Sequence, residues 1–573
     1  MVVASNRFPI VGIGASAGGI AAMEGLFRGL PADCDMAFVV VTHLSANRES
    51  RLHEVVGRYT TLPTVVAENG QTVVPGTVYV MPNNTIMTIA KGRLVLRKPD
   101  MNAGTRKPVD IFFSALATDQ AEYAVGIVLS GGDSDGTLGI KAIKEHGGLT
   151  IAQSADHSGP TTPDMPESAI ASGLIDLALP ADEMGAKLRE FSRSFDLLAE
   201  LCEADGEKAL NGAKPQIYDI LHARSGHDFS GYKANTFLRR VRRRMQLADL
   251  PLVETYLNHL REDPTEVDSL FRDLLINVTD FFRDTGAFKM LEEVVIPEML
   301  LGRTANDTVR IWVPGCATGE EVYSIGMLMR ERLDQMDAPP RVTIFATDID
   351  APVLGVARAG RYPTTLLENL TPERRERFFI TEGSSAVVVK DLREMCVFSP
   401  HSVIKDPPFA RMDLVSCRNL LIYFGPDVQD RVIPTFHYAL KPGGFLFLGT
   451  AESVGRHGDL FAPLDGGHRI FRAREHSAAR RMSLLMTAND DKSPFGKTPP
   501  ATQPAPFPLR MVVESLVLAR YSPAHVVVNA DGDVVYYSAN TGRYLEAPQG
   551  APNRQLLSIA RRDLRLALRS ALR

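Results

Sequence analysis

The sequence predicts a multidomain α/β protein with two parallel-sheet domains, a small helical domain between them and a partial α+β segment at the end. Its 573 residues exceed what one hydrophobic core organises. Strand-like and helix-like patterns alternate over residues 9 to about 190 and again over 308–475, which is typical of parallel sheets covered by helices. Two glycine-rich turns, within 9–26 and 309–329, each follow an apolar segment and precede an amphipathic one.

Composition narrows the class of protein. Apolar content of 45% and charged content of 23% are ordinary for a soluble globular chain, and the net charge of −5 argues against bulk nucleic-acid binding. The cysteines form no C-x-x-C pair, which indicates reduced thiols and no zinc site. The sequence shows neither a signal-peptide pattern nor an uninterrupted apolar segment of about 18 residues. We therefore expect a cytoplasmic protein without an integral membrane segment or a bound metal.

The first α/β region contains five further short apolar strands, "FVVVTHL", "GTVYVMP", "AVGIVLSGG", "LTIAQ" and "IDLALP". The polar segment 203–215 predicts a linker, and helical periods follow it. A Pro- and Thr-rich segment predicts a second linker, and alternating residues around Asp531-Gly532 predict a hairpin. The expected domains are 1–195, 211–290, 291–475 and 511–573, with a linker over 476–510.

The first glycine turn allows two kinds of site. Gly12, Gly14 and Ala17 fit a loose dinucleotide fingerprint, and Gly14-Ala-Ser-Ala-Gly18 fits a nucleophile elbow around Ser16. A dinucleotide site needs an acidic residue after the second strand, but "MAFVVVTHLS" has His43 there. The missing acid favours the nucleophile.

A later strand in the same region, "AVGIVLSGGDSDGTLG", is followed by Asp133 and Asp135. Carboxyl ends of parallel strands share one sheet edge, so Ser16, His43 and one aspartate are expected to meet. Ser16 would attack an ester carbonyl, His43 would take its proton, and the aspartate would orient the imidazole. The alternative is a helix-capping serine with an unrelated histidine.

The second glycine turn favours a nucleoside. The next strand, "RVTIFATDID", ends in Asp348 and Asp350, which supplies the acidic partner that the first turn lacks. The turn around Gly315 has no G-x-G-x-x-G pattern, so S-adenosylmethionine fits better than a pyrophosphate ligand. Glu320 and Glu321 open the helix, where they suit the helix dipole or a ligand ammonium group. With "MDLVSCRNLLIYF" and "LKPGGFLFLGTAES", the order is typical of a class I methyltransferase.

A basic helix precedes this second region. "NTFLRRVRRRMQL" (235–247) carries five arginines, with apolar residues between them at helical spacing. The pattern is compatible with a solvated basic face or with a surface that docks acidic helices. Aromatic residues that would stack on bases are not interleaved with the arginines.

Five segments of the first region, "GIGASAGG", "VVTHLS", "RKPVDIFFSALA", "GIVLSGGDSDGTLG" and "MPESAI", resemble the catalytic domain of the CheB-type chemotaxis receptor methylesterases. The resemblance implies a Ser16, His43 and Asp135 triad that hydrolyses glutamate methyl esters and deamidates glutamine. Asp133 replaces a glycine of that family and adds a carboxylate beside the triad.

Five segments of the second region, "LLINVTDFFRD", "GCATGEEVYS", "ATDID", "SPHSVIKDPPF" and "CRNLLIYF", resemble the CheR-type receptor methyltransferases. The resemblance implies that Tyr423 positions the acceptor carboxylate and that the helical unit docks receptors through Arg239, Arg240 and Arg243. Ser402 stands where that family commonly has asparagine. The implied contacts of S-adenosylmethionine are Asn277, Thr279, Arg283, Gly315, Glu320, Asp348, Ser402, Val403 and Asn419.

The two resemblances together predict a protein-glutamate methylesterase fused to a protein-glutamate O-methyltransferase, acting on chemoreceptors or similar acidic helical proteins. An insert around "FFITEGSSAVVVKDLREMCVF" resembles a receptor-tethering β-subdomain, and the tail from about residue 511 resembles the first half of a PAS domain. The alternatives are a catalytically degenerate scaffold and the same chemistry on a protein other than a receptor.

Overall fold

The computed structural model describes residues 8–30, 34–42, 51–99, 107–155, 160–201, 205–275, 277–383, 385–475 and parts of 526–569. The chain divides into two units, residues 1–490 and 491–573. No helix within these described ranges combines the length and the apolar character that a membrane crossing requires.

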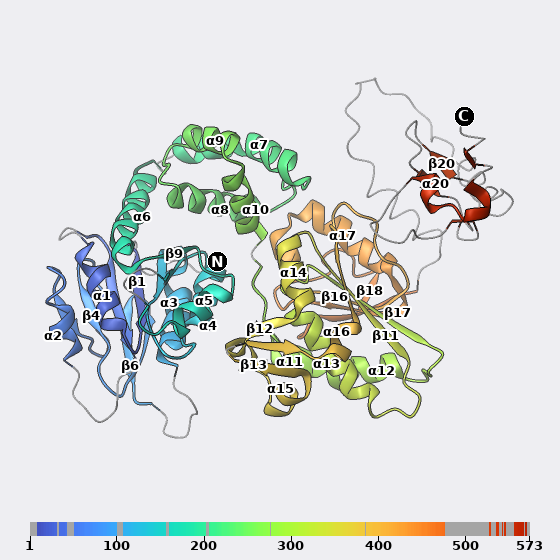
Figure 1. The fold of residues 1–573 in the computed structure, drawn as a ribbon, viewed down its shortest axis with the longest axis horizontal. Helices are drawn as coiled ribbons and strands as arrows, with labels where there is room; N and C mark the ends of the chain where they lie inside the picture. The colour runs from blue at the N-terminus through green and yellow to red at the C-terminus, as the bar shows by residue number, and fades with distance from the viewer. Residues whose placement is uncertain are drawn as a thin grey trace. The chain divides into compact units, whose positions relative to one another are not determined.

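The first domain is built on a parallel sheet of seven strands in the order β3-β4-β2-β1-β7-β8-β9 (Figure 1). All of its strand pairs are parallel, which confirms the predicted architecture and the five predicted strands. The strands are β1 Ile10–Ala15, β2 Ala37–Thr42, β3 Thr64–Val66, β4 Val78–Val80, β7 Ala124–Val128, β8 Leu149–Gln153 and β9 Leu177–Leu179.

Helices cover both faces of this sheet, which explains why its central strands are apolar without alternation. Phe38 and Val40 of β2 belong to the core under α1 and α6, whereas Val39 and Val41 belong to the core under α3, α4 and α5. The helices are α1 Gly19–Arg28, α2 Leu52–Val56, α3 Pro108–Gln120, α4 Thr137–His146, α5 Asp164–Ala171 and α6 Ala181–Leu201, and a hairpin pairs β5 Ile86–Ala90 with β6 Arg93–Arg97.

A bundle of helices follows the first domain, and its first helix shows that the prediction of a linker at 203–215 was wrong. Residues 203–215 were expected to be a loop, but α7 begins at Asp205 and continues to Ser225. Leu210, Ala213 and Ile217 of α7 are buried, at a spacing that places them on one helix face. Packing of this apolar stripe outweighs the glycines and the proline of the segment. The other helices are α8 Ala234–Leu247, α9 Val253–Glu262 and α10 Pro264–Leu275.

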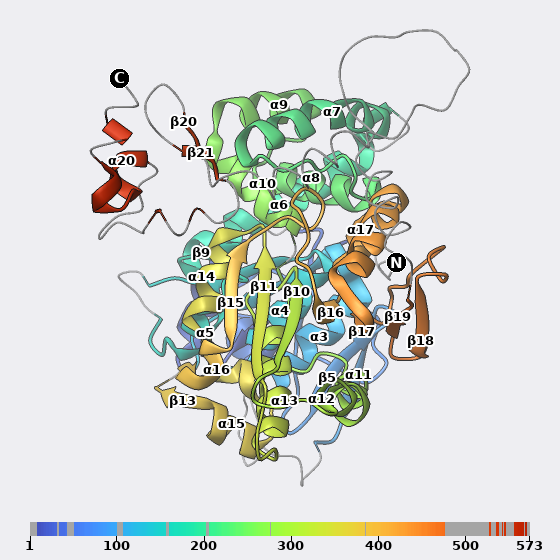
Figure 2. The same cartoon turned by 90° about the vertical axis from the view of Figure 1, so that its right-hand side faces the viewer.

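The second sheet has the order β15-β11-β10-β16-β17-β19-β18 and is parallel except for β18 and β19 at one edge. The carboxyl end of β11 points toward the helices α8 and α10 (Figure 2). The strands are β10 Thr308–Pro314, β11 Arg341–Asp348, β15 Cys396–Pro400, β16 Met412–Cys417, β17 Leu440–Leu448, β18 Phe461–Asp465 and β19 Ile470–Ala473. Helices around it are α11 Thr285–Met290, α12 Ile296–Leu300, α13 Glu320–Leu333, α14 Ala351–Ala359 and α17 Pro426–Ala439.

The predicted insert forms a separate antiparallel sheet in the order β12-β14-β13. Its strands are β12 Arg361–Pro363, β13 Phe379–Glu382 and β14 Ser385–Val388, and it carries α15 Pro372–Phe378 and α16 Lys390–Glu394.

In the second unit, β20 (Val526–Val528) pairs with β21 (Val534–Tyr537) in an antiparallel hairpin, as predicted, and α20 covers Leu556–Ile559. Its turn residues Asp531 and Gly532, and the linker 476–510, lie outside the described residues. The PAS resemblance of this tail stays a prediction.

Candidate active sites

Ser16 lies directly after β1 and before α1, in the turn that the sequence singled out. Its N–H donates to the carbonyl oxygen of Ser130 (3.0 Å), in the loop after β7. Gly18 has a φ of 79°, and a Cβ there would come within 2.8 Å of the Ser130 Oγ. The turn therefore requires glycine at this position, both for its backbone conformation and for the close approach of the two loops.

The loop after β7 also passes beside the Ser16 side chain. A Cβ at Gly131 would lie 3.0 Å from the Ser16 Cβ and 1.9 Å from the sulfur of Met165. The Gly131 N–H donates to the Thr162 carbonyl oxygen (2.9 Å), and the Met165 N–H donates to the Gly131 carbonyl oxygen (3.0 Å). Ser16 is thus held against the loop that carries the predicted acidic residue.

Asp135 is completely buried at the end of this loop. Its carboxylate accepts the N–H groups of Val109, Asp110 and Gly136, each at 2.9 Å. Two of these donors belong to the first turn of α3, where N–H groups lack helical partners. Asp135 therefore anchors α3 to the loop.

Asp133, the departure from the family pattern, accepts the backbone N–H of Asp135 at 2.8 Å. This short-range bond shapes the turn that presents Asp135. His43 lies outside the described residues, so its role as general base stays a prediction.

A further carboxyl near this loop, Asp110, was not singled out by sequence reasoning. Its side chain accepts the Gly139 N–H at 2.7 Å. Burial, and then the neighbouring Asp135, raise its pKa to about 7. The only signal for it was its place inside the motif "RKPVDIFF".

The second site is a cleft at the carboxyl edge of the second sheet, with one wall from the helical bundle. All the predicted cofactor contacts except Glu320 line this cleft together with Tyr423. Gly315 has a φ of 68°, and a Cβ there would meet the Leu420 side chain at 2.9 Å. The glycine thus lets the turn approach the loop after β16. The predicted residues on this lining are Asn277, Thr279, Arg283, Gly315, Asp348, Ser402, Val403 and Asn419.

Asp348 ends β11 at the floor of the cleft, with 7% of its surface exposed. Its carboxylate accepts the N–H groups of Ala317 (2.9 Å) and Asp350 (3.0 Å). Burial raises the pKa of Asp348, against the opposing effect of these two N–H groups. The bond to Ala317 fixes the carboxylate beside the glycine turn.

Of the two glutamates that open α13, Glu321 lines the cleft and Glu320 does not, and the contact of Glu320 with the cofactor stays a prediction. Glu321 accepts the Ser416 hydroxyl (2.6 Å), and Arg418 lies 3.9 Å away. Glu320 accepts the Thr318 hydroxyl (2.6 Å), and burial raises its pKa to about 7. Consecutive helical residues point about 100° apart, which explains why only one enters the cleft.

The different positions of Glu320 and Glu321 relative to the cleft can be tested by replacing each of them. Glu321→Gln is expected to weaken the binding of S-adenosylhomocysteine by about 10-fold or more, because a charged hydrogen-bond acceptor is lost from the lining. Glu320→Gln is the matched control and is expected to change the dissociation constant by less than about twofold. Calorimetric titration of both full-length variants measures the difference, and a larger loss for Glu320→Gln would contradict the placement.

Sequence reasoning missed two buried groups: Arg418, which lines the cleft, and Glu452, which holds a loop of the cleft from behind. Glu452 accepts the backbone N–H groups of Asn419 (3.0 Å), Ile422 (3.2 Å) and Gly449 (2.7 Å). It holds the loop 418–423, in which Asn419 has a positive φ of 58°. Arg418 donates to the Arg283 carbonyl oxygen (2.9 Å). The motifs "CRNLLIYF" and "GTAES" contain both residues, but nothing in the sequence pairs them.

The cleft fits the expected cofactor. Among the described residues, the Nε and Nη1 groups of Arg418 are buried without a hydrogen-bond partner although the side chain lines the cleft. Such donors suit a ligand carboxylate, Asp348 suits ribose hydroxyls, and Val403 with Ile349 offers apolar surface for a base.

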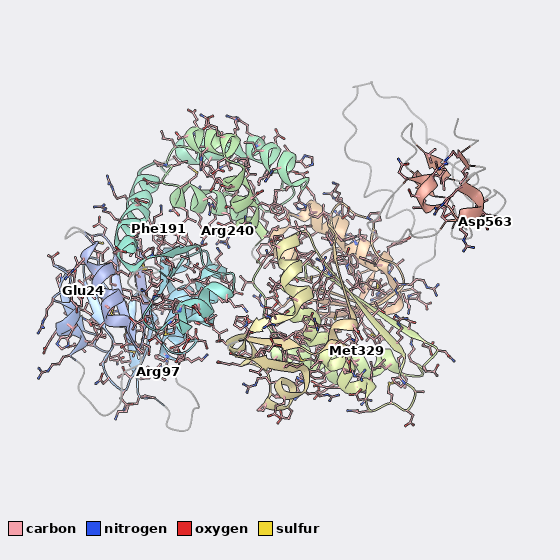
Figure 3. All side chains as sticks on the ribbon, in the orientation of Figure 1. Glu24, Arg97, Phe191, Arg240, Met329 and Asp563 are labelled. Carbon is pink, nitrogen blue, oxygen red and sulfur yellow. The ribbon has the colours of Figure 1, made fainter. Side chains whose placement is uncertain are left out.

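The arginines of α8 differ from the expected exposed face. Arg240, which Figure 3 labels, lies on this helix, and its exposed fraction is 1%. Arg243 is 5% exposed. Arg243 pairs with Asp273 (2.5 Å) and with Asp176 of the first domain. The sequence pattern indicates which face of the helix is charged, but it does not indicate which domains pack against that face. Docking through Arg239, Arg240 and Arg243 stays a prediction that requires α8 to be uncovered.

Comparison with known families gives three consecutive matches. Residues 11–188 match the CheB methylesterase family. Residues 215–275 match the all-alpha domain of CheR methyltransferases, and residues 277–470 match their SAM binding domain.

The chain is also similar to individual proteins. The chain is 35% identical over 529 residues to an "Uncharacterized 104.1 kDa protein in hypE 3'region" of Rhodobacter capsulatus, covering 88% of this chain but only 54% of that protein. It is 34% identical to the "Putative methyltransferase Cher3" of Pseudomonas putida, covering 45% of this chain and 94% of that one. A solved CheB methylesterase catalytic domain from Thermotoga maritima is 30% identical, with a TM-score of 0.30, covering 32% of this chain and 98% of that domain.

Proposed function

The chain belongs to the CheR methyltransferase family, with a CheB methylesterase domain ahead of the methyltransferase, and we propose that it both adds and removes methyl groups on protein glutamates. The expected substrates are the acidic helices of cytoplasmic chemoreceptor domains. The domains proposed for this function are 1–195, 211–290 and 291–475. The observation that carries the proposal is the convergence of the predicted cofactor residues on one cleft.

In methyl transfer, the cofactor supplies an activated methyl group on its sulfonium. A glutamate side chain is ionised near pH 7, so it needs no general base. The chain's own contribution is to hold the acceptor carboxylate in line and to exclude water. Tyr423 suits this role, because it lines the cleft and is half-buried, and desolvation raises the pKa of its hydroxyl and keeps it a hydrogen-bond donor.

In ester hydrolysis, the Ser16 hydroxyl would attack the methyl ester and release methanol, with His43 receiving and then returning the proton. Water would next hydrolyse the acyl-enzyme and restore the glutamate. Backbone N–H groups of Ala17, Gly18 and Gly132, in the two turns beside Ser16, are candidates for binding the oxyanion. Asp135, already bonded to three N–H groups, is proposed to orient the imidazole.

A two-readout assay tests the proposal. The full chain, tritiated S-adenosylmethionine and the cytoplasmic fragment of a chemoreceptor from the same organism should give base-labile label on the fragment. Pre-methylated fragment should release methanol when the chain is added without cofactor. Binding of S-adenosylhomocysteine with neither reaction would favour a signalling scaffold. Labelling of other proteins but not of receptor fragments would favour a different substrate.

A further inference from the structure

Helix α4 of the methylesterase domain begins directly after the Asp135 loop and faces the methyltransferase. Lys141, Lys144 and Glu145 are three and four positions apart, so they share one face of this helix. All three interact with residues of the methyltransferase part of the chain. One face of α4 is therefore an interface between the two catalytic domains.

Lys141 joins this face to the wall of the cofactor cleft. Its ammonium group donates to the Thr279 carbonyl oxygen and to the Asp280 carboxylate, and the residue is 5% exposed. Thr279 lines the cofactor cleft. The contact thus holds the segment that contains Asn277 and Arg283, and both of these residues line the cofactor cleft.

Glu145 presents a glutamate carboxylate to this wall. Its Oε1 lies 3.6 Å from Nη2 of Arg283, and the side chain is 27% exposed. Burial raises the pKa of Glu145, and Arg283 and Lys141 oppose that effect. The charges of Arg240, Arg283 and Glu145 also act on the Tyr423 hydroxyl. Glu145 therefore places its carboxylate against Arg283, a residue of the cleft lining.

The basic helix α8 is covered at the same interface. Arg243 donates to the Gly148 carbonyl oxygen (3.2 Å), just beyond the end of α4, and to Asp176, which also pairs with Lys144. Burial alone would raise the pKa of Asp176, but Arg243 and Lys144 hold it below its usual range. An acidic residue of the first domain thus neutralises an arginine of the predicted receptor-docking helix.

This covering leaves Arg240 incompletely bonded. Arg240 is 1% exposed, and its Nε and Nη2 groups lack hydrogen-bond partners among the described residues. Burial lowers its pKa to about 10. A buried guanidinium with unpaired N–H groups is costly, so an acidic ligand that completes its bonding would be favoured over the present contact.

We propose that α4 occupies the acceptor side of the methyltransferase cleft as an internal substitute for the substrate helix. In this arrangement Glu145 takes the place of the acceptor glutamate, and Asp176 takes the place of an acidic residue that flanks it on the substrate. An acidic receptor helix competes with both residues for the arginines that they contact. The interface is made of ion pairs, as in domain contacts that open and close. This inference rests on the proposed function, and it makes docking of the methylesterase domain a brake on methyl transfer.

The test compares the full chain with the double variant Lys141→Ala/Glu145→Ala. A control, Glu24→Ala/Arg28→Ala, also removes one acidic and one basic side chain four positions apart, here an ion pair of 2.5 Å on α1. Helix α1, where Figure 3 labels Glu24, covers the opposite face of the sheet from α4. Because an apparent KM rises as the open fraction falls, the α4 variant should lower the KM for the receptor fragment by about 5-fold or more. Its kcat and its affinity for S-adenosylhomocysteine should stay within about twofold of wild type, and the control should match wild type.

Hydrogen exchange of 137–147 and 277–283 provides a readout that needs no turnover, and both segments should exchange faster in the α4 variant. An unchanged or higher KM, weaker cofactor binding, or unchanged exchange would overturn the inference. If wild type transfers no methyl groups, the proposed function fails instead, and the exchange result alone decides whether α4 is a releasable contact.

Discussion

Asp348→Ala is expected to abolish detectable binding of S-adenosylhomocysteine, weakening it by at least about 100-fold, and to eliminate methyl transfer. The substitution removes the carboxylate that suits the ribose hydroxyls, and hydrogen bonds to charged groups contribute about 1.5–3 kcal/mol each. It also removes the acceptor for the Ala317 N–H, which fixes the glycine turn. Calorimetric titration of the full chain measures the binding, and tritium incorporation measures the activity.

Two further variants separate binding from folding. Asp337→Ala removes an exposed carboxylate from the same domain and should bind like wild type. Asp348→Asn keeps an oxygen that accepts the Ala317 N–H but loses the charge, so it should fold normally and still bind about 10-fold more weakly or worse. Near-normal binding by a folded Asp348→Ala protein would refute the nucleoside assignment.

Ser16→Ala is expected to reduce methanol release from methylated receptor by about 10⁴-fold, because the attacking oxygen is removed. Methyl incorporation should remain at the wild-type rate, since Ser16 belongs to the first domain and the cofactor cleft to the second. Methanol release and tritium incorporation are measured on the same preparation.

The small change from serine to alanine leaves the N–H of residue 16 free to bond the Ser130 carbonyl oxygen, so the turn should keep its shape. Ser114→Ala, on the exposed side of α3, is the control for loss of a hydroxyl. Equal ester hydrolysis by Ser16→Ala and wild type would exclude Ser16 as the nucleophile, while leaving the methyltransferase proposal intact.

Much of the architecture was predictable because it depends on local patterns. Short apolar strands between amphipathic segments predicted both parallel sheets, and the two glycine turns identified the strand ends where sites form. The prediction of a linker at 203–215 was wrong for a physical reason. Its glycines and proline suggested a loop, whereas burial of Leu210, Ala213 and Ile217 stabilises α7 through tertiary packing.

The sequence by itself predicted the strand ends at which the candidate residues lie: Ser16 after β1, Asp135 in the loop after β7, and Asp348 as the last residue of β11. Parallel strands bring such residues to one edge, so chain order and residue type were sufficient. Only the tertiary structure decided that Glu321 rather than Glu320 enters the cleft, that Glu452 holds the loop of Asn419, and that Arg240 and Arg243 are covered. These outcomes depend on side-chain direction and on contacts between domains, and neither is encoded in local periodicity.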